Sequence, residues 1–560
     1  MLNPLDATTR RALLWIIGAC FVAHIWCLGS QFYLDDMAQI RDSEYVRHLW
    51  FWQQRTNAWT FLWYELQAML FGVSPIGFHA FNWLLHTAIA CVIYVSGRDY
   101  LRGSAPDGVA WFGALLFAVH PLASEIPNYA RTQDLAWVTL FSLLAAWQLF
   151  RAMHAGTWKN LLGALLCIAG ASFSKGPGFL HASVMCAVIG LAFTTRQHWQ
   201  LVRKYVWIPC VLAVVGLAAL WKFDMLARAA HWSEPRVIGH AYTIGRVFWE
   251  FAWRAVLPIH LSADHHIQET LIQPGSVFRT ADTTALWAML GMVLFAIACV
   301  VLVCRKNTRV VGVCFFLFVG TMLMRVLYFI PEFMPEYRIY PGLPWLCLGS
   351  AILLATAWRA MFRSSPLIPA VLLLGVFAVM SAQRSFLFHD LNDLMADVLR
   401  QYPGQARAIW ILQRNDFEAG RLQQVIERQQ RQFPKVREAF LQENRRLAPR
   451  RELPSGHFAM AEVGCWGIYA QAVAKLQSPS AGLREINKLE AYMQAMHIEQ
   501  ETNAIHWSIF HHAKALVLET GGNYQAAAEF LTLDGVPSAD RKTDLERVQA
   551  KLKHEPPAAP

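Results

Sequence analysis

Residues 284–303 read TALWAMLGMVLFAIACVVLV, twenty consecutive positions without a charged side chain. A helix of this length is long enough to cross the hydrocarbon core of a bilayer, which is about 30 Å thick. Similar apolar runs recur from residue 11 to about residue 383, too many for one signal peptide. The chain has 560 residues, of which 16% are charged, against about 25% in typical soluble proteins. The sequence therefore predicts a polytopic membrane protein and excludes an ordinary soluble enzyme or a secreted disulfide scaffold.

Eleven apolar segments are predicted to span the membrane. They cover residues 11–29, 76–97, 109–123, 134–150, 160–173, 178–194, 205–222, 284–303, 310–329, 342–358 and 367–383. Alternate threading places 14 Lys and Arg residues, against three Asp residues, on the side of the N-terminus. Because basic loops stay in the cytoplasm, we expect the N-terminus inside and everything after residue 383 outside. The expected location is the cell inner (plasma) membrane, with most carboxylates on the outer face.

The charge distribution argues against nucleic-acid binding. The net charge is +10, but residues 1–383 carry 27 Lys and Arg against 18 Asp and Glu, whereas residues 384–560 carry 22 against 21. The basic surplus lies in the membrane part, where loop charges set orientation, so no nucleic-acid partner is expected. Ten of the 11 cysteines lie in or next to predicted spans, and Cys465 lies beyond them. No disulfide framework is therefore expected in the outer part.

The composition predicts two domains, an all-α membrane domain at residues 1–383 and a helical extracytoplasmic domain at residues 384–560. In the second domain, residues 506–531 read as a helix, a Gly-Gly-Asn-Tyr turn and a second helix. This segment resembles one tetratricopeptide hairpin, although a 34-residue repeat is missing from the sequence. Such hairpins would bind or position a partner, or would act as a packing cap over the membrane domain.

Four arginines recur at intervals of seven in the outer domain, at Arg407, Arg414, Arg421 and Arg428. They would share one face of an unbroken helix. That face could contact anionic headgroups, but a solvated helix face is the more common explanation of such a pattern.

Two adjacent carboxylates, Asp35 and Asp36, follow the first predicted span in the stretch FYLDD at residues 32–36. Paired acids at a membrane boundary are costly to desolvate and need a reason. A general base must be ionised near an acceptor hydroxyl, and a neighbouring carboxylate or cation can tune its pKa. The alternative interpretation of this pair is a helix N-cap.

Other polar side chains gather at the outer ends of the predicted spans. His79, Asn82 and His86 share one helix face, which would either line a site or join helices by hydrogen bonds. Lys175 lies in the break SKGPG at residues 174–178, where it would contact a phosphate or snorkel to the interface. The remaining candidates in outer loops are His120, Glu125, Arg131, Asp264, Glu336 and Arg338.

A metal site is not favoured. Asp264, His265 and His266 are adjacent in sequence, but adjacent side chains seldom converge on one ion without further ligands. We expect no metal and no cofactor.

Five segments, in order, resemble the GT-C superfamily of polytopic glycosyltransferases, and within it the TMTC-type protein O-mannosyltransferases. They are YLDD at 33–36, FHAFNWLLH at 78–86, LFAVHP at 116–121 with Glu125 and Arg131, WRAVLPIHLSAD at 253–264, and EYRIYP at 336–341. The sequence departs from the family's pattern at two places. A tyrosine separates Glu336 from Arg338, which are adjacent in the family, and a glycine follows Lys175 where the family has a glutamate. Bacterial pilin O-glycosyltransferases are a further similar group.

The resemblance implies an inverting transferase that takes a sugar from a polyprenyl-phosphate carrier at the outer leaflet. It implies that Asp35 or Asp36 deprotonates the acceptor hydroxyl, with Asp35 favoured as the base. It also implies that Lys175 and Arg338 hold the lipid phosphate and that Glu125 orients the substrate. A protein acceptor such as a pilin is expected.

Two other functions remain open from the sequence. A lipid-directed transferase, such as one that modifies lipid A, would use the same donor. A transporter would place its polar groups near the midplane and often shows repeated halves, whereas here the polar groups crowd one face.

Overall fold

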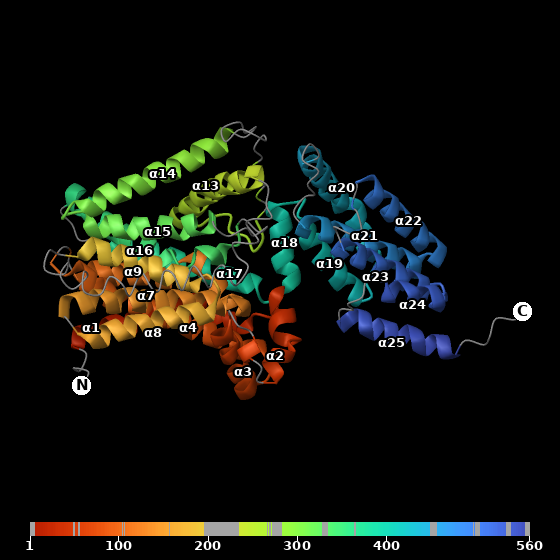
Figure 1. Cartoon of the computed structure of the whole chain (residues 1–560), viewed down its shortest axis with the longest axis horizontal. Helices are drawn as coiled ribbons and strands as arrows, with labels where there is room; N and C mark the ends of the chain where they lie inside the picture. The colour runs from red at the N-terminus through yellow and green to blue at the C-terminus, as the bar shows by residue number, and fades with distance from the viewer. Residues whose placement is uncertain are drawn as a thin grey trace, which may run out of the picture. The chain divides into compact units, whose positions relative to one another are not determined.

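The computed structural model forms helices throughout the part of the chain that it describes (Figure 1). The described residues are 6–48, 51–53, 57–103, 105, 107–155, 157–194, 234–265, 267, 270, 283–326, 334–362, 366–447, 456–496, 498, 504–533 and 539–554. The predicted span at 205–222 lies outside these ranges. The chain divides into two compact units, Met1–Leu391 and Asn392–Pro560.

Helices occupy the other ten predicted spans of the first unit. They are α1 (Ala7–His24), α4 (Pro75–Leu101), α5 (Asp107–Ala118), α7 (Gln133–Ala155), α8 (Trp158–Ser174), α9 (Gly178–Phe193), α14 (Thr283–Cys304), α15 (Arg309–Val326), α16 (Leu343–Met361) and α17 (Leu367–Leu387). Six helices in the described ranges are long and apolar enough to cross a membrane, or seven if a pair bent by 54° at residues 118–121 counts as one. This is fewer than the eleven predicted, in part because α8 and α9 have only 17 and 16 residues. The described part of the chain is thus all-helical, with several candidate membrane spans.

A further helix, α13 (Glu234–Val256), lies between the predicted spans 205–222 and 284–303, where no helix was predicted. Its buried side chains Ile244, Val247, Phe248 and Phe251 recur at helical spacing and join the main hydrophobic core. It packs against α14 and α15. The apolar stripe, rather than overall hydropathy, places this helix against the bundle.

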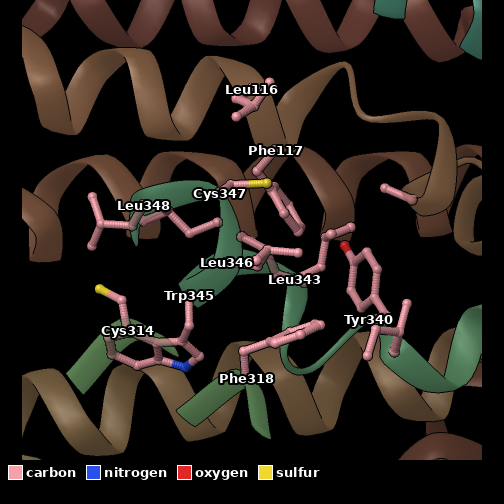
Figure 2. Close-up of a cluster of buried hydrophobic side chains, with 14 of the residues drawn as sticks. Leu116, Phe117, Cys314, Phe318, Tyr340, Leu343, Trp345, Leu346, Cys347 and Leu348 are labelled. Atoms are coloured by element: carbon pink, nitrogen blue, oxygen red, sulfur yellow. The ribbon is translucent and has the colours of Figure 1, made fainter. Parts of the chain in front are cut away.

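Part of the main hydrophobic core lies where α16 packs against α5 and α15 (Figure 2). Trp345 and Phe318 are almost fully buried there, with Phe117 and Tyr340 beside them. A Cβ on Gly113 of α5 would lie 3.1 Å from the backbone of α16, so the small residue permits the close approach of these two helices.

Four described elements between residues 37 and 71 form a compact segment between α1 and α4. These are the π-helical turn η2 (Met37–Arg41), α2 (Glu44–Arg47), η3 (Phe51–Gln53) and α3 (Ala58–Phe71). The segment has its own small core around Ile40, Phe61, Tyr64 and Phe78. Because Phe78 belongs to α4, this core fixes the segment to the rest of the first unit.

The second unit is a series of helices. They are α18 (Leu391–Gln401), α19 (Ala406–Glu418), α20 (Leu422–Leu447), α21 (Gly456–Leu476), α22 (Pro479–Ala495), α23 (Ala504–Thr520), α24 (Tyr524–Thr532) and α25 (Ala539–His554). The predicted helix–turn–helix is present as α23 and α24, with Gly522 at φ 79° and Asn523 accepting a hydrogen bond from the N–H of Ala526. This one hairpin does not establish a tetratricopeptide fold.

The spacing of the four arginines had predicted that they share one face of an unbroken helix. The structure differs, because a break between two helices divides the arginines. Gly420, at φ 73°, separates α19 from α20. Arg421 and Arg428 both contact the carboxylate of Asp416, whereas Arg414 pairs with Glu418. A left-handed glycine ends the first helix, so these side chains brace a helical hairpin.

Candidate functional site

The two adjacent acids of the loop after α1 have different environments. Asp35 is exposed, whereas the Asp36 side chain is fully buried. The preceding residue, Leu34, has a φ of 49°, which is unusual for a residue with a branched side chain. Such strain persists only where surrounding contacts enforce it. The turn therefore presents the carboxylate of Asp35 outward and that of Asp36 inward.

Asp36 ties the first loop to the segment before α7. Its Oδ1 atom accepts a 2.6 Å hydrogen bond from the backbone N–H of Arg131, and Oδ2 accepts a 3.4 Å bond from the N–H of Tyr33. Asp36 occupies the N-cap position of η2, but its side chain makes no capping bond to that turn and contacts Arg131 and Tyr33 instead. Burial raises the pKa of Asp36 well above its usual range, more than these two hydrogen bonds lower it, and nearby Asp35 adds to the rise.

Two cations converge on one carboxylate beside this contact. Arg131 Nη1 and Lys175 Nζ each lie 2.7 Å from the same Oδ2 atom of Asp134. The Asp134 side chain is 1% exposed, whereas Arg131 and Lys175 are 15% and 28% exposed. One negative and two positive charges leave a net positive charge, and the accessible groups are the cations. This arrangement suits an anion such as a phosphate.

The electrostatics around Lys175 also involve a third cation. Burial lowers the pKa of Lys175, Asp134 opposes that effect, and Arg131 and Arg338 lower the pKa further. Arg338 is half-buried in the 3₁₀ turn η6 (Glu336–Ile339), with its guanidinium 5.8 Å from the centre of the Tyr337 ring. The predicted phosphate contacts Lys175 and Arg338 are thus electrostatically coupled, with Arg131 beside Lys175.

Helix α3 supports these cations from the first loop. The hydroxyl of Thr60 donates a 2.8 Å bond to the carbonyl of Ser174, directly before Lys175. The hydroxyl of Tyr64 lies 3.2 Å and 3.1 Å from the carbonyls of Ala130 and Arg131. Since all three acceptors are backbone carbonyls, these contacts fix the positions of the two turns that carry Lys175 and Arg131.

The polar stripe of α4 joins helices. His79 Nδ1 lies 3.0 Å from the carbonyl of Pro127, and Asn82 Nδ2 donates to the carbonyls of Ile126, Tyr129 and Ala130. His86 Nε2 lies 3.2 Å from the carbonyl of Ala118, and its Nδ1 lies 2.8 Å from the Tyr340 hydroxyl. All three stripe residues are fully buried. They hold the segment 118–130 in place behind the site.

His120 and Glu125 are likewise buried and engaged with the backbone. His120 Nε2 lies 3.1 Å from the carbonyl of Ala255, and its Nδ1 accepts from the N–H of Leu122. Glu125 begins the short helix α6 (Glu125–Asn128), and its Oε2 accepts a 2.7 Å bond from the N–H of Tyr337. Glu125 therefore connects its own loop to the turn that carries Arg338.

Glu336 lies at the centre of a second buried network. Its Oε1 accepts from the N–H of Ser262 at 2.8 Å and lies 2.7 Å from His265 Nε2, and its Oε2 pairs with Arg384. Arg384 also donates to the Ser124 hydroxyl at 3.0 Å. Burial alone would raise the pKa of Glu336, but Arg384 and the bonds from His265 and Ser262 outweigh it, so the pKa is lowered.

Asp264 is half-buried next to this network, and its N–H and carbonyl both contact the hydroxyl of Ser262. His266 lies outside the described residues. Across the described ranges, groups of three or more His, Cys, Asp and Glu side chains that could hold a metal are absent.

The structure thus brings Asp35, Asp36, Arg131 and Lys175 into one continuous set, with Arg338 coupled to it. His79, His86, His120, Glu125 and Glu336 lie behind that set, in buried contacts between segments.

Three participants were missed as site residues by sequence reasoning: Asp134, Arg384 and Tyr129. Asp134 follows the Arg-Thr-Gln triplet in a span and reads as a helix start. Arg384 falls one residue after the predicted end of the last span, although α17 continues to Leu387. Tyr129 carries no sequence signal, and its hydroxyl accepts a 3.3 Å bond from the N–H of Asp35.

A comparison with curated proteins finds one similarity of note. The chain is 22% identical over 284 residues to a protein O-mannosyl-transferase of Caenorhabditis elegans, which covers 46% of this chain and 39% of that protein. The chain thus spans about two fifths of the length of this relative. No family model matches the chain, and no solved structure matches it. The similarity supports a relationship with membrane glycosyltransferases.

Proposed function

We propose that this chain is a GT-C-type glycosyltransferase that moves a sugar from a polyprenyl-phosphate carrier to a hydroxyl of a protein acceptor, such as a pilin. The observation that carries the proposal is the hydrogen bond between Asp36 and the N–H of Arg131. It connects the turn that carries the exposed Asp35 to the segment that carries Arg131, whose partly exposed side chain shares Asp134 with Lys175. A base beside an anion site is what transfer from a phosphate-linked donor needs.

In the proposed reaction, Asp35 accepts the proton of the acceptor hydroxyl as its oxygen attacks the anomeric carbon. The bond from that carbon to the acceptor oxygen forms while its bond to the phosphate oxygen breaks, with inversion of configuration. The electron pair leaves with the phosphate, and Lys175, Arg131 and Arg338 stabilise the added negative charge. Because phosphate is a good leaving group, no second carboxylate is needed as an acid.

The location of the polar groups favours a transferase over a transporter. Asp36, Arg131, Lys175 and Glu336 lie in turns or at helix ends, whereas transporters bind substrates at broken helices near the membrane midplane. The basic loops predict that this end faces outward, so we place the reaction at the extracytoplasmic face of the inner membrane. In this proposal the helical second unit, also outside, presents the protein acceptor.

The proposal is tested by intact mass spectrometry of surface and secreted proteins, pilins included. Cells with the wild-type chain are compared with cells that carry Asp35→Asn/Asp36→Asn at equal expression. Loss of a hexose- or pentose-sized mass from one protein supports the proposal and identifies the acceptor. Unchanged protein masses with an altered lipid mass would show a lipid acceptor instead, and no change in either would exclude glycosyl transfer.

A further inference from the structure

We infer that Tyr129 is a positioning residue that orients Asp35 through the backbone of the Asp35 turn. The inference rests on the proposed function, since it assigns a role in the same reaction. Its basis is one contact: the Tyr129 hydroxyl accepts a 3.3 Å hydrogen bond from the N–H of Asp35, across 94 positions of sequence.

The turn that carries Asp35 needs an external support. Leu34 has a left-handed φ of 49°, a conformation that is energetically unfavourable for a residue with a side chain. Within the turn, the N–H of Asp36 donates to the carbonyl of Tyr33 at 3.0 Å, and Asp36 Oδ2 accepts from the N–H of Tyr33. These bonds close the loop but leave the N–H of Asp35 to a partner from elsewhere. Tyr129 supplies that partner.

Tyr129 is itself held rigidly. The residue is 4% exposed. The centroid of its ring lies 4.5 Å from that of Tyr33 and 6.0 Å from that of Tyr337. Its carbonyl accepts from Asn82 at 3.1 Å and from the hydroxyl of Thr132 at 2.7 Å. A hydroxyl on so fixed a ring defines one position for the amide of Asp35.

The same short segment also sets the distance from the base to the phosphate site. Tyr129 holds Asp35, and two residues later the N–H of Arg131 holds Asp36 while its side chain reaches Asp134. The positions of the exposed carboxylate and of the cations therefore both depend on one stretch of backbone, residues 129–131. A small displacement of a reacting group costs catalytic rate, because alignment is part of the barrier reduction.

The hydroxyl keeps its own proton when it accepts from the amide. That proton can be donated to a carboxylate or substrate oxygen next to the turn. Tyr129→Phe removes one oxygen atom and leaves the ring packing in place, so it isolates the contribution of this group.

The test is steady-state transfer by the purified full chain, for wild type, Tyr129→Phe and Tyr100→Phe. Tyr100 is the matched control because its buried hydroxyl has no hydrogen-bond partner among the described residues and lies at the far end of α4. We expect Tyr129→Phe to lower kcat about five- to tenfold, the effect of one hydrogen bond of roughly 1 kcal/mol, with the donor KM unchanged. Tyr100→Phe should match wild type.

A second measurement separates positioning from general destabilisation. Hydrogen exchange of the amides at residues 33–37 should accelerate in Tyr129→Phe, while exchange in the rest of the bundle stays as in wild type. An unchanged kcat, or a loss of rate shared by Tyr100→Phe, would overturn the inference. A wild-type chain without transfer activity would instead refute the proposed function, so the two failures are distinguishable.

Discussion

The Oδ1 atom of Asp36 accepts a 2.6 Å hydrogen bond from the backbone N–H of Arg131, a residue 95 positions away in sequence. This bond connects the loop after α1 to the turn that precedes α7. Asp36 is buried in this contact, whereas the adjacent Asp35 stays exposed. The division of roles between Asp35 and Asp36 follows from it.

Asp35→Asn should lower the transfer rate by roughly two orders of magnitude or more, as expected for removal of a general base. Asp36→Asn should also abolish most activity, because an amide cannot accept at both of its atoms and would loosen the turn. Transfer assays on both variants, with membrane insertion measured alongside, check this. Wild-type activity in both single variants would contradict the assignment of the base.

Lys175→Met should raise the KM for the lipid-linked donor about tenfold or more, because a charge-assisted contact to the phosphate is lost. The matched control is Lys159→Met, at the opposite, exposed end of the same helix α8. Donor-concentration series on both variants provide the measurement. Equal KM values for the two variants would exclude Lys175 from the phosphate site.

Gly178→Ala should reduce both stability and activity. A Cβ at Gly178 would lie 1.8 Å from the carbonyl oxygen of Ala171, so the break that carries Lys175 would have to move. At Gly190, further along α9, the nearest atom to an added Cβ is a leucine methyl at 3.7 Å, an ordinary contact. Gly190→Ala is therefore the control. Thermal denaturation and transfer assays should show a loss for the first variant and none for the second.

Arg384→Met should destabilise the first unit by about 3–5 kcal/mol, because it leaves Glu336 charged and buried without its cation. The double variant Glu336→Gln/Arg384→Met should recover part of the loss. Because the pKa of Glu336 is lowered in the folded state, its carboxylate adds to the free energy of unfolding above the pKa of the unfolded chain, near 4.5. This added stability is lost as the pH falls through the lower pKa of the folded state. Thermal melts of the full chain in detergent measure each effect. A double variant as unstable as Arg384→Met alone would argue against this pairing.

Glu462 in α21 should make the second unit less stable at alkaline pH. Burial raises its pKa to about 8, although its hydrogen bond from the Tyr492 hydroxyl and the nearby Arg437 lower it. The contribution of protonated Glu462 to the free energy of unfolding is therefore fully present below its ordinary pKa near 4.5 and is lost as the pH rises through its folded-state pKa of about 8. Glu462→Gln should flatten this dependence in limited proteolysis of the full chain between pH 6 and pH 9. The exposed Glu438→Gln control should retain it.

Much of the architecture could be predicted from local sequence. Apolar runs of spanning length predicted helices at ten described positions, because hydropathy and helix length depend only on neighbouring residues. Helix α13 was not predicted, since its single apolar stripe does not raise the average hydropathy of the segment. The prediction that the four arginines share one helix face was also wrong. One left-handed glycine, Gly420, divides the helix on which the pattern depended.

The sequence alone determined that the chain has helical apolar segments, several of them long enough to be candidate membrane spans, and which polar residues lie near them. Tertiary structure alone decided which of them are buried and which are accessible. Asp36 meets Arg131, Glu125 meets Tyr337 and Glu336 meets Arg384 across 95, 212 and 48 positions. Such pairings depend on how helices pack, and packing sums many weak contacts from distant segments, so residue type and spacing do not encode it.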